Sequence, residues 1–193
     1  MQFPTPNQDE NFVLGPGATT IMMRRLPLQL TIAMLEELLN SVVPGQYDFI
    51  YFPCGKRKGR NIALAFINFT SHLAAQAAVA LLTAKGTFGE RGPQVSRSEV
   101  QGLGPNLAYY IARFGWQELN DPSAPRVYRE GKHVQNLVGA VCQLIDMEMV
   151  NQAMDFLAKE SAGLPASDGR RRRGQNARSA GLDVPPDCAT WEV

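Results

Sequence analysis

Basic and aromatic side chains gather between residues 24 and 97 in a pattern that suits contact with a nucleic acid. Lysine and arginine neutralise phosphates and release counterions, whereas exposed rings stack on bases. We predict that these side chains form a basic rim around an aromatic surface; solvated loop charge and ordinary packing are the alternatives. The basic residues are Arg24, Arg25, Lys56, Arg57, Lys58, Arg60 and Arg97, and the rings are Tyr47, Tyr51 and Phe66.

Catalytic and metal-binding patterns find no support in the sequence. His72 and His133 stand outside any recognisable nucleophile motif, and a glycine-rich phosphate loop followed by Lys-Ser or Lys-Thr is missing. The cysteines Cys54, Cys142 and Cys188 are odd in number and lack the paired spacing of a zinc site. The sequence therefore predicts a protein that is not an enzyme, needs no cofactor and keeps its thiols reduced.

The segment 60–70 alternates small and large residues with the period of a strand that is buried on one side. Its two predicted faces are Ala63, Ala65, Ile67 and Phe69 toward the core, and Ile62, Leu64, Phe66 and Asn68 away from it. The second face carries Leu and Phe beside a basic loop, so we predict that it is a binding platform and not plain solvent-facing surface. Thr70 and Ser71 then cap a helix of small residues that can lie close to the sheet.

The order of predicted elements indicates the fold class. Strands are predicted at 19–26, 47–53, 62–69 and 95–100, with helices that begin near Thr31 and Ser71. This order is that of a ferredoxin-like split βαβ fold of the α+β class (βαββαβ), in which a four-stranded antiparallel sheet carries two helices on one face. The opposite face is then free. By parity Tyr47, Phe49 and Tyr51 share one face, and parity alone leaves open which face is the core.

Two segments resemble the signature of a known family. Ile21 to Leu26 falls where an RNA recognition motif carries its short RNP segment, and Ile62 to Phe69 falls where it carries the long one. More narrowly, residues 18–116 resemble the C-terminal RNA recognition motif of Mei2-like proteins, which are eukaryotic regulators of meiosis and development. The matching segments are Met22-Met23-Arg24-Arg25-Leu26-Pro27, Tyr47-Asp48-Phe49, Ala65-Phe66-Ile67-Asn68-Phe69-Thr70-Ser71 and Gln101-Gly102-Leu103.

The resemblance implies single-stranded RNA as the partner, bound on the free face of the sheet without a cofactor, and a role in post-transcriptional or developmental regulation. The usual stacking positions of the family fall on Met22, Leu64 and Phe66, and Phe66 alone among them has a ring. The resemblance and the basic and aromatic pattern together predict a set of RNA-binding residues. The set is Met22, Arg24, Arg25, Tyr47, Tyr51, Lys56, Arg57, Lys58, Arg60, Leu64, Phe66, Asn68 and Arg97.

Beyond the resemblance, composition divides the rest of the chain. It predicts a flexible leader at 1–17, a linker at 117–132 and a disordered basic tail at 161–193, whose Arg170 to Arg173 suit nuclear import or RNA contact. The sequence shows neither a membrane-spanning apolar run nor a secretion signal. We therefore expect an intracellular protein, nuclear and/or cytoplasmic, with no membrane partner.

Two further helical segments leave an alternative function open. An aromatic-rich helix begins near Pro105 and either extends the free face or covers it. The segment 133–160 carries an apolar stripe along one long or two short helices, which docks on the domain or binds another protein. The competing interpretation is therefore a protein-interaction module whose sheet face is covered, and its oligomeric state is left open.

Overall fold

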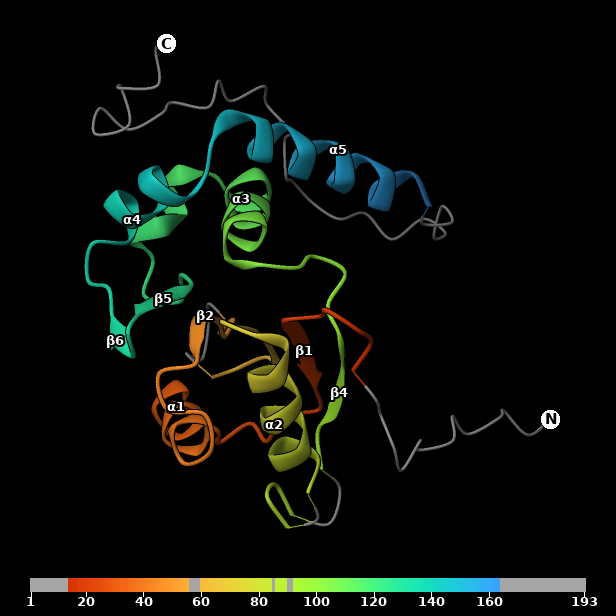
Figure 1. Ribbon diagram of the computed structural model, residues 1–193. Helices are drawn as coiled ribbons and strands as arrows, with labels where there is room; N and C mark the ends of the chain where they lie inside the picture. The colour runs from red at the N-terminus through yellow and green to blue at the C-terminus, as the bar shows by residue number, and fades with distance from the viewer. Residues whose placement is uncertain (1–13, 56–59, 85, 90–91, 164–193) are drawn as a thin grey trace, which may run out of the picture.

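The computed structural model describes residues 14–55, 60–84, 86–89 and 92–163, and the structural statements below concern this part of the chain. The predicted order of the first six elements is confirmed (Figure 1). None of the described helices is long and apolar enough to cross a membrane. The elements are β1 (Thr20–Arg24), α1 (Ile32–Asn40), β2 (Tyr47–Tyr51), β3 (Leu64–Phe69), α2 (His72–Thr83), β4 (Gln94–Arg97), α3 (Leu103–Phe114), the 3₁₀-helix η1 (Trp116–Asn120), β5 (Arg126–Arg129), β6 (Lys132–His133), α4 (Leu137–Leu144) and α5 (Met147–Gly163).

The strands form one antiparallel sheet in the order β4-β1-β3-β2-β5-β6. The predicted four-stranded sheet is its first part, and β5 and β6 extend it beyond β2. Phe66 on the central strand pairs with Met22 on one side and with Tyr51 on the other. Because residues paired across antiparallel strands project to the same face, these three side chains form one row on the sheet.

The helices α1 and α2 cover one face of the sheet (Figure 1). Thr31 and Ser71 cap them as predicted, each accepting a hydrogen bond at 3.2 Å from the backbone N–H three residues later. The alanines of α2 let this helix lie close to the sheet, and its Leu82 is fully buried. The core on this side includes Ile21, Met23, Ala65, Ile67 and Phe69, so the predicted core face of β3 is confirmed for its last three members.

The helices α3, α4 and α5 lie on the opposite face, so the sheet is the middle of three layers (Figure 1). Phe49, Leu107 and Val141 belong to a second apolar cluster between the sheet and these helices. The apolar stripe predicted at 133–160 thus docks on the domain, as two helices. Gly104 permits the close approach, because a Cβ there would lie 3.1 Å from the carbonyl oxygen of Leu144.

The prediction of a linker at 117–132 is wrong. This segment contains η1 and β5, and Val127 of β5 pairs with Phe49 of β2. The tyrosine of β5, Tyr128, is buried on the side of α1. Pairing with the open edge of β2 orders this segment, whereas its own short run of residues carries too weak a strand pattern to predict one.

Polar contacts and a tight turn complete the attachment of β5. Arg126 Nη1 lies 2.8 Å from Glu36 Oε1 on α1, and the hydroxyl of Tyr128 donates to the same carboxylate. Glu130 and Gly131 then turn the chain into β6 with φ angles of 52° and 75°, as a two-residue hairpin turn requires. A Cβ on Gly131 would lie 3.1 Å from the Cα of Gly45, so glycine is needed there for space as well as for conformation.

The cysteines differ from one another. Cys54 carries a free thiol, whereas Cys142 is disulfide-bonded. The expectation of reduced thiols is therefore wrong for Cys142, because a single bridge leaves no spacing pattern in a sequence.

Candidate nucleic-acid interface

A cleft of about 400 Å³ lies between the second face of the sheet and the helices α3 and α5. Met22, Leu64 and Phe66, the three positions implied by the resemblance, are half-buried and line it. Leu64 and Phe66 therefore point away from α1 and α2, as predicted. The predicted site residues that the structure brings together in this cleft are Met22 and Arg24 from β1, Tyr51 from β2, Leu64 and Phe66 from β3, and Arg97 from β4.

The helix α3 provides an aromatic wall beside the row on the sheet. Tyr51 lies nearly parallel to Phe66, with ring centroids 6.2 Å apart, and Tyr110 meets Tyr51 edge-on at 5.3 Å. Phe114 is 6.3 Å from Tyr51 and remains 43% exposed. The helix thus covers the β2 side of the face and borders an opening over β1 and β3. The helix therefore covers the face over β2, and it extends the face beside β1 and β3.

The phenol groups of this wall are neutral at physiological pH. Burial raises the pKa of Tyr51 and of Tyr110 above the ordinary value of 10.0, although the nearby Arg113 lowers the pKa of Tyr51 in part. Neutral rings keep their faces available for stacking without repelling phosphates. The charges of the cleft therefore come from its arginines and carboxylates.

Three arginines line the cleft. Arg24 pairs with Leu64 and is exposed on the cleft face of the sheet, and Arg113 is exposed on α3. Arg97 is exposed on the edge strand β4, where its paired residue is the core residue Ile21. The Arg113 guanidinium lies 5.7 Å from the ring centroid of Phe114 and 5.9 Å from that of Tyr109. Guanidinium groups bind phosphates through paired N–H donors, and Arg24 and Arg113 line the same cleft as the half-buried ring of Phe66. In the described residues, His, Cys, Asp and Glu side chains nowhere gather into a group that could hold a metal ion.

The placement of Tyr47 on the free face is wrong. Its side chain is 2% exposed and belongs to the cluster on the side of α1 and α2. Its hydroxyl donates to Asn40 Oδ1 at 3.1 Å, and its ring meets Tyr128 edge-on at 4.8 Å. The register of β2 shifts between Tyr47 and Phe49, and this irregularity breaks the parity on which the prediction depended.

Asn68 points to the predicted face but is 3% exposed. Its Oδ1 accepts a hydrogen bond from the Thr20 hydroxyl at 2.7 Å, and its Nδ2 donates to Asp48 Oδ1 at 2.7 Å. Thr20 Oγ1 in turn accepts from Asn106 Nδ2 on α3 at 3.2 Å. The predicted RNA contact by Asn68 is therefore replaced by an internal network, because α3 covers this end of the face.

Replacement of Asp48 with asparagine should stabilise the protein at neutral pH. Burial raises the pKa of the Asp48 carboxyl above 3.8, although the hydrogen bond from Asn68 opposes the shift. A raised pKa means that the folded state binds more protons than the unfolded state just above pH 3.8, so wild-type stability falls as pH rises through that range. Asp48→Asn keeps an acceptor for Asn68 and removes this loss.

Denaturant titrations from pH 3 to pH 7 would measure the effect. We expect equal free energies of unfolding at the acid end and a growing advantage of Asp48→Asn above pH 4. A variant that matches wild type at the acid end but is less stable at neutral pH would show that the charge of Asp48 supports the network.

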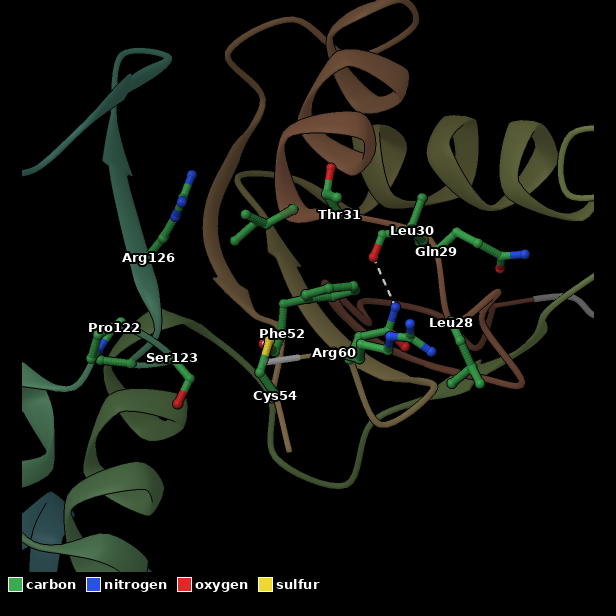
Figure 2. A pocket seen from close by; sticks show the side chains of 13 residues that line it. Leu28, Gln29, Leu30, Thr31, Phe52, Cys54, Arg60, Pro122, Ser123 and Arg126 are labelled. Atoms are coloured by element: carbon green, nitrogen blue, oxygen red, sulfur yellow. Dashed lines mark hydrogen bonds between the residues drawn. The ribbon is translucent and has the colours of Figure 1, made fainter. Parts of the chain in front are cut away.

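Arg60 lies at a different place from Arg24 and Arg97. It lines a second cavity of about 690 Å³, between the segment that precedes α1 and the segment between η1 and β5. Phe52 and Cys54 also line this cavity, and the Asn61 amide beside it donates to the Leu30 carbonyl at 2.8 Å (Figure 2). The cavity does not share the aromatic row, so Arg60 is separate from the cleft.

Of the remaining predicted cations, Arg25 alone lies in the described part of the chain. Arg25 is exposed at the end of β1 in the left-handed region, with φ of 60°, and does not line the cleft. Lys56, Arg57 and Lys58 lie outside the described residues. Of the predicted basic set, the cleft therefore contains Arg24 and Arg97.

Several cleft residues were not predicted as site residues. They include Tyr109, Arg113 and Phe114 of α3 and Phe156 and Glu160 of α5. The aromatic content of α3 was a signal that this helix meets the sheet. Arg113 and Glu160 have no comparable signal, because they meet only when α5 packs along α3.

Comparison with known proteins agrees with this geometry. The family model described as RNA recognition motif 2 matches residues 18–100. Residues 18–100 are thus similar to an RNA recognition motif. A stretch of 63 residues is 38% identical to the protein MEI2-like 5 of Oryza sativa subsp. japonica, and the match covers 32% of this chain and 8% of that protein. The RNA recognition motif thus resembles those of Mei2-like proteins, and the chain spans a small part of the length of this relative.

Solved structures similar to the RNA recognition motif include the following. The Sex-lethal RNA recognition domains 1 and 2 from Drosophila melanogaster are 22% identical, with a TM-score of 0.37, over 42% of this chain and 50% of that one. The Glorund qRRM2 domain is 26% identical, with a TM-score of 0.32, over 43% of this chain and 91% of that one.

Proposed function

We propose that the cleft binds single-stranded RNA. The observation that carries this proposal is the half-buried ring of Phe66, which lies at a stacking position of the motif and shares one cleft with Arg24 and Arg113. Stacking on Phe66 would hold a base without strong sequence preference, and the guanidinium groups would hold the adjacent phosphates. A cleft of about 400 Å³ has room for unstacked bases but none for a double helix.

The proposal includes a biological setting. The match to a Mei2-like relative supports a role in post-transcriptional or developmental regulation inside the cell. The proposed function of the cleft is recognition of RNA without a covalent step. It therefore requires neither a cofactor nor a catalytic residue.

A salt titration tests the proposal. Fluorescence anisotropy of labelled single-stranded RNA of mixed sequence should give an affinity that falls linearly with the logarithm of the salt concentration, with a slope of about −0.7 for each phosphate contacted. Arg24→Ala should weaken binding and reduce this slope by about 0.7, because Arg24 pairs with Leu64 and projects to the cleft face. Arg129→Ala is the matched control, because Arg129 is also exposed and lies on β5 away from the cleft.

The same titration distinguishes the alternative function. The alternative is a protein-interaction module, and its support is that α3 covers the β2 side of the sheet face at Tyr51. Failure of the protein to bind RNA even at low salt would overturn the RNA proposal and leave this alternative. Equal effects of Arg24→Ala and Arg129→Ala would place RNA elsewhere on the surface.

A further inference from the structure

A carboxylate from α5 stands among the proposed phosphate-binding groups. Glu160 lines the cleft together with Arg113 and Tyr109 of α3. Its Oε2 accepts a hydrogen bond from the Tyr109 hydroxyl at 3.1 Å and lies 3.9 Å from Arg113 Nη1. Arg113 Nη1 also donates to the Tyr109 hydroxyl at 2.8 Å, which joins the three groups in one cluster.

The packing of α5 holds Glu160 at this place. Val150 and Ala153 are buried in the apolar cluster that α3 and α5 share. One turn before Glu160, the ring of Phe156 meets that of Tyr109 edge-on at 6.0 Å. The helix therefore positions the carboxylate beside Arg113, and this position does not depend on the weak ion pair between the two side chains.

Breaking the ion pair between Arg113 and Glu160 costs little free energy. Both side chains are well exposed, at 50% for Arg113 and 39% for Glu160, and the two atoms are 3.9 Å apart. Exposed pairs of this kind contribute little because water screens them. A phosphate that meets the guanidinium through two N–H donors forms a stronger contact and can take the place of the carboxylate.

We propose that Glu160 is a built-in competitor for RNA phosphate at Arg113, which sets how tightly the cleft binds single-stranded RNA. This inference depends on the proposed function. In the free protein the carboxylate neutralises Arg113; when RNA enters, a phosphate replaces the carboxylate, which turns to solvent. Glu160 lowers affinity by occupying one cation and by repelling the strand.

Charge removal at Glu160 tests the inference in the full chain. Glu160→Gln should bind labelled single-stranded RNA about fivefold more tightly than wild type. Its salt slope should stay near that of wild type, because a phosphate contacts Arg113 in both complexes. Asp155→Asn is the matched control, because it removes the same charge from an exposed residue of α5 that does not line the cleft. Its affinity should stay near that of wild type.

A double variant identifies the partner of Glu160. In the Arg113→Ala background, Glu160→Gln should bring a smaller gain than in wild type, since the competition takes place at Arg113. An equal gain in both backgrounds would overturn the inference, and so would equal effects of Glu160→Gln and Asp155→Asn. In either case, RNA binding by the wild-type protein would still support the proposed function. Failure of every variant to bind RNA would overturn both, whereas binding by Glu160→Gln alone would support both.

Discussion

Replacing Phe66 with alanine is expected to weaken binding of single-stranded RNA by about 1–3 kcal/mol, roughly 5-fold to 150-fold. The effect should be large because Met22 and Leu64, the other two stacking positions, carry no ring. Tyr51 is stacked 6.2 Å from Phe66 but is itself covered by Tyr110 and Phe114 of α3. Among the described residues Phe66 is therefore the one well-placed sheet ring for a base, and its loss has no substitute in the described cleft.

Two companion variants separate stacking from folding. Phe66→Leu keeps an apolar side chain in the cleft floor and should lose nearly as much affinity as the alanine variant. Phe66→Tyr keeps the ring and should bind like wild type. Circular dichroism would confirm that all three variants fold. Undiminished binding by a folded Phe66→Ala protein would show that bases are not held at this ring.

Leu107→Ala should lower the free energy of unfolding by about 2–5 kcal/mol. Leu107 on α3 is fully buried in the cluster between the sheet and the C-terminal helices. Truncation there leaves a cavity that close-packed neighbours fill only in part. Urea unfolding followed by circular dichroism would measure the loss as a lower midpoint.

Leu82→Ala is the natural comparison, because Leu82 on α2 is equally buried in the other apolar cluster. If the two clusters belong to one cooperative unit, both variants shift the same single transition by similar amounts. A Leu107→Ala protein that unfolds in two separate steps would show instead that α3, α4 and α5 open independently of the sheet.

The sequence predicted the part of the fold that local patterns control. Alternation along β3 placed Leu64 and Phe66 opposite Ala65 and Ile67, and the structure confirms this. The same reasoning misplaced Tyr47, because an irregularity in β2 changes parity without leaving a mark in residue types. β5 was missed because pairing with a distant edge orders it. Local periodicity cannot report such long-range pairing.

The cleft was predictable on one side only. Its floor follows from strand parity and from the resemblance, since Met22, Leu64 and Phe66 occupy known positions of the motif. Its wall depends on how α3 and α5 pack, and their apolar stripes fit more than one partner. Arg113 and Glu160 are 47 positions apart and become neighbours only through that packing.

The attachment of β5 to β2 has a consequence for where the chain can be cut. A fragment that stops at residue 100, the end of the match to the family model, would keep β2 but lose the strand that satisfies its outer edge. It would also expose Phe49, which is 2% exposed in the folded protein, and an open edge beside apolar surface promotes aggregation. The boundary at which this chain folds therefore lies beyond the boundary at which its family likeness ends.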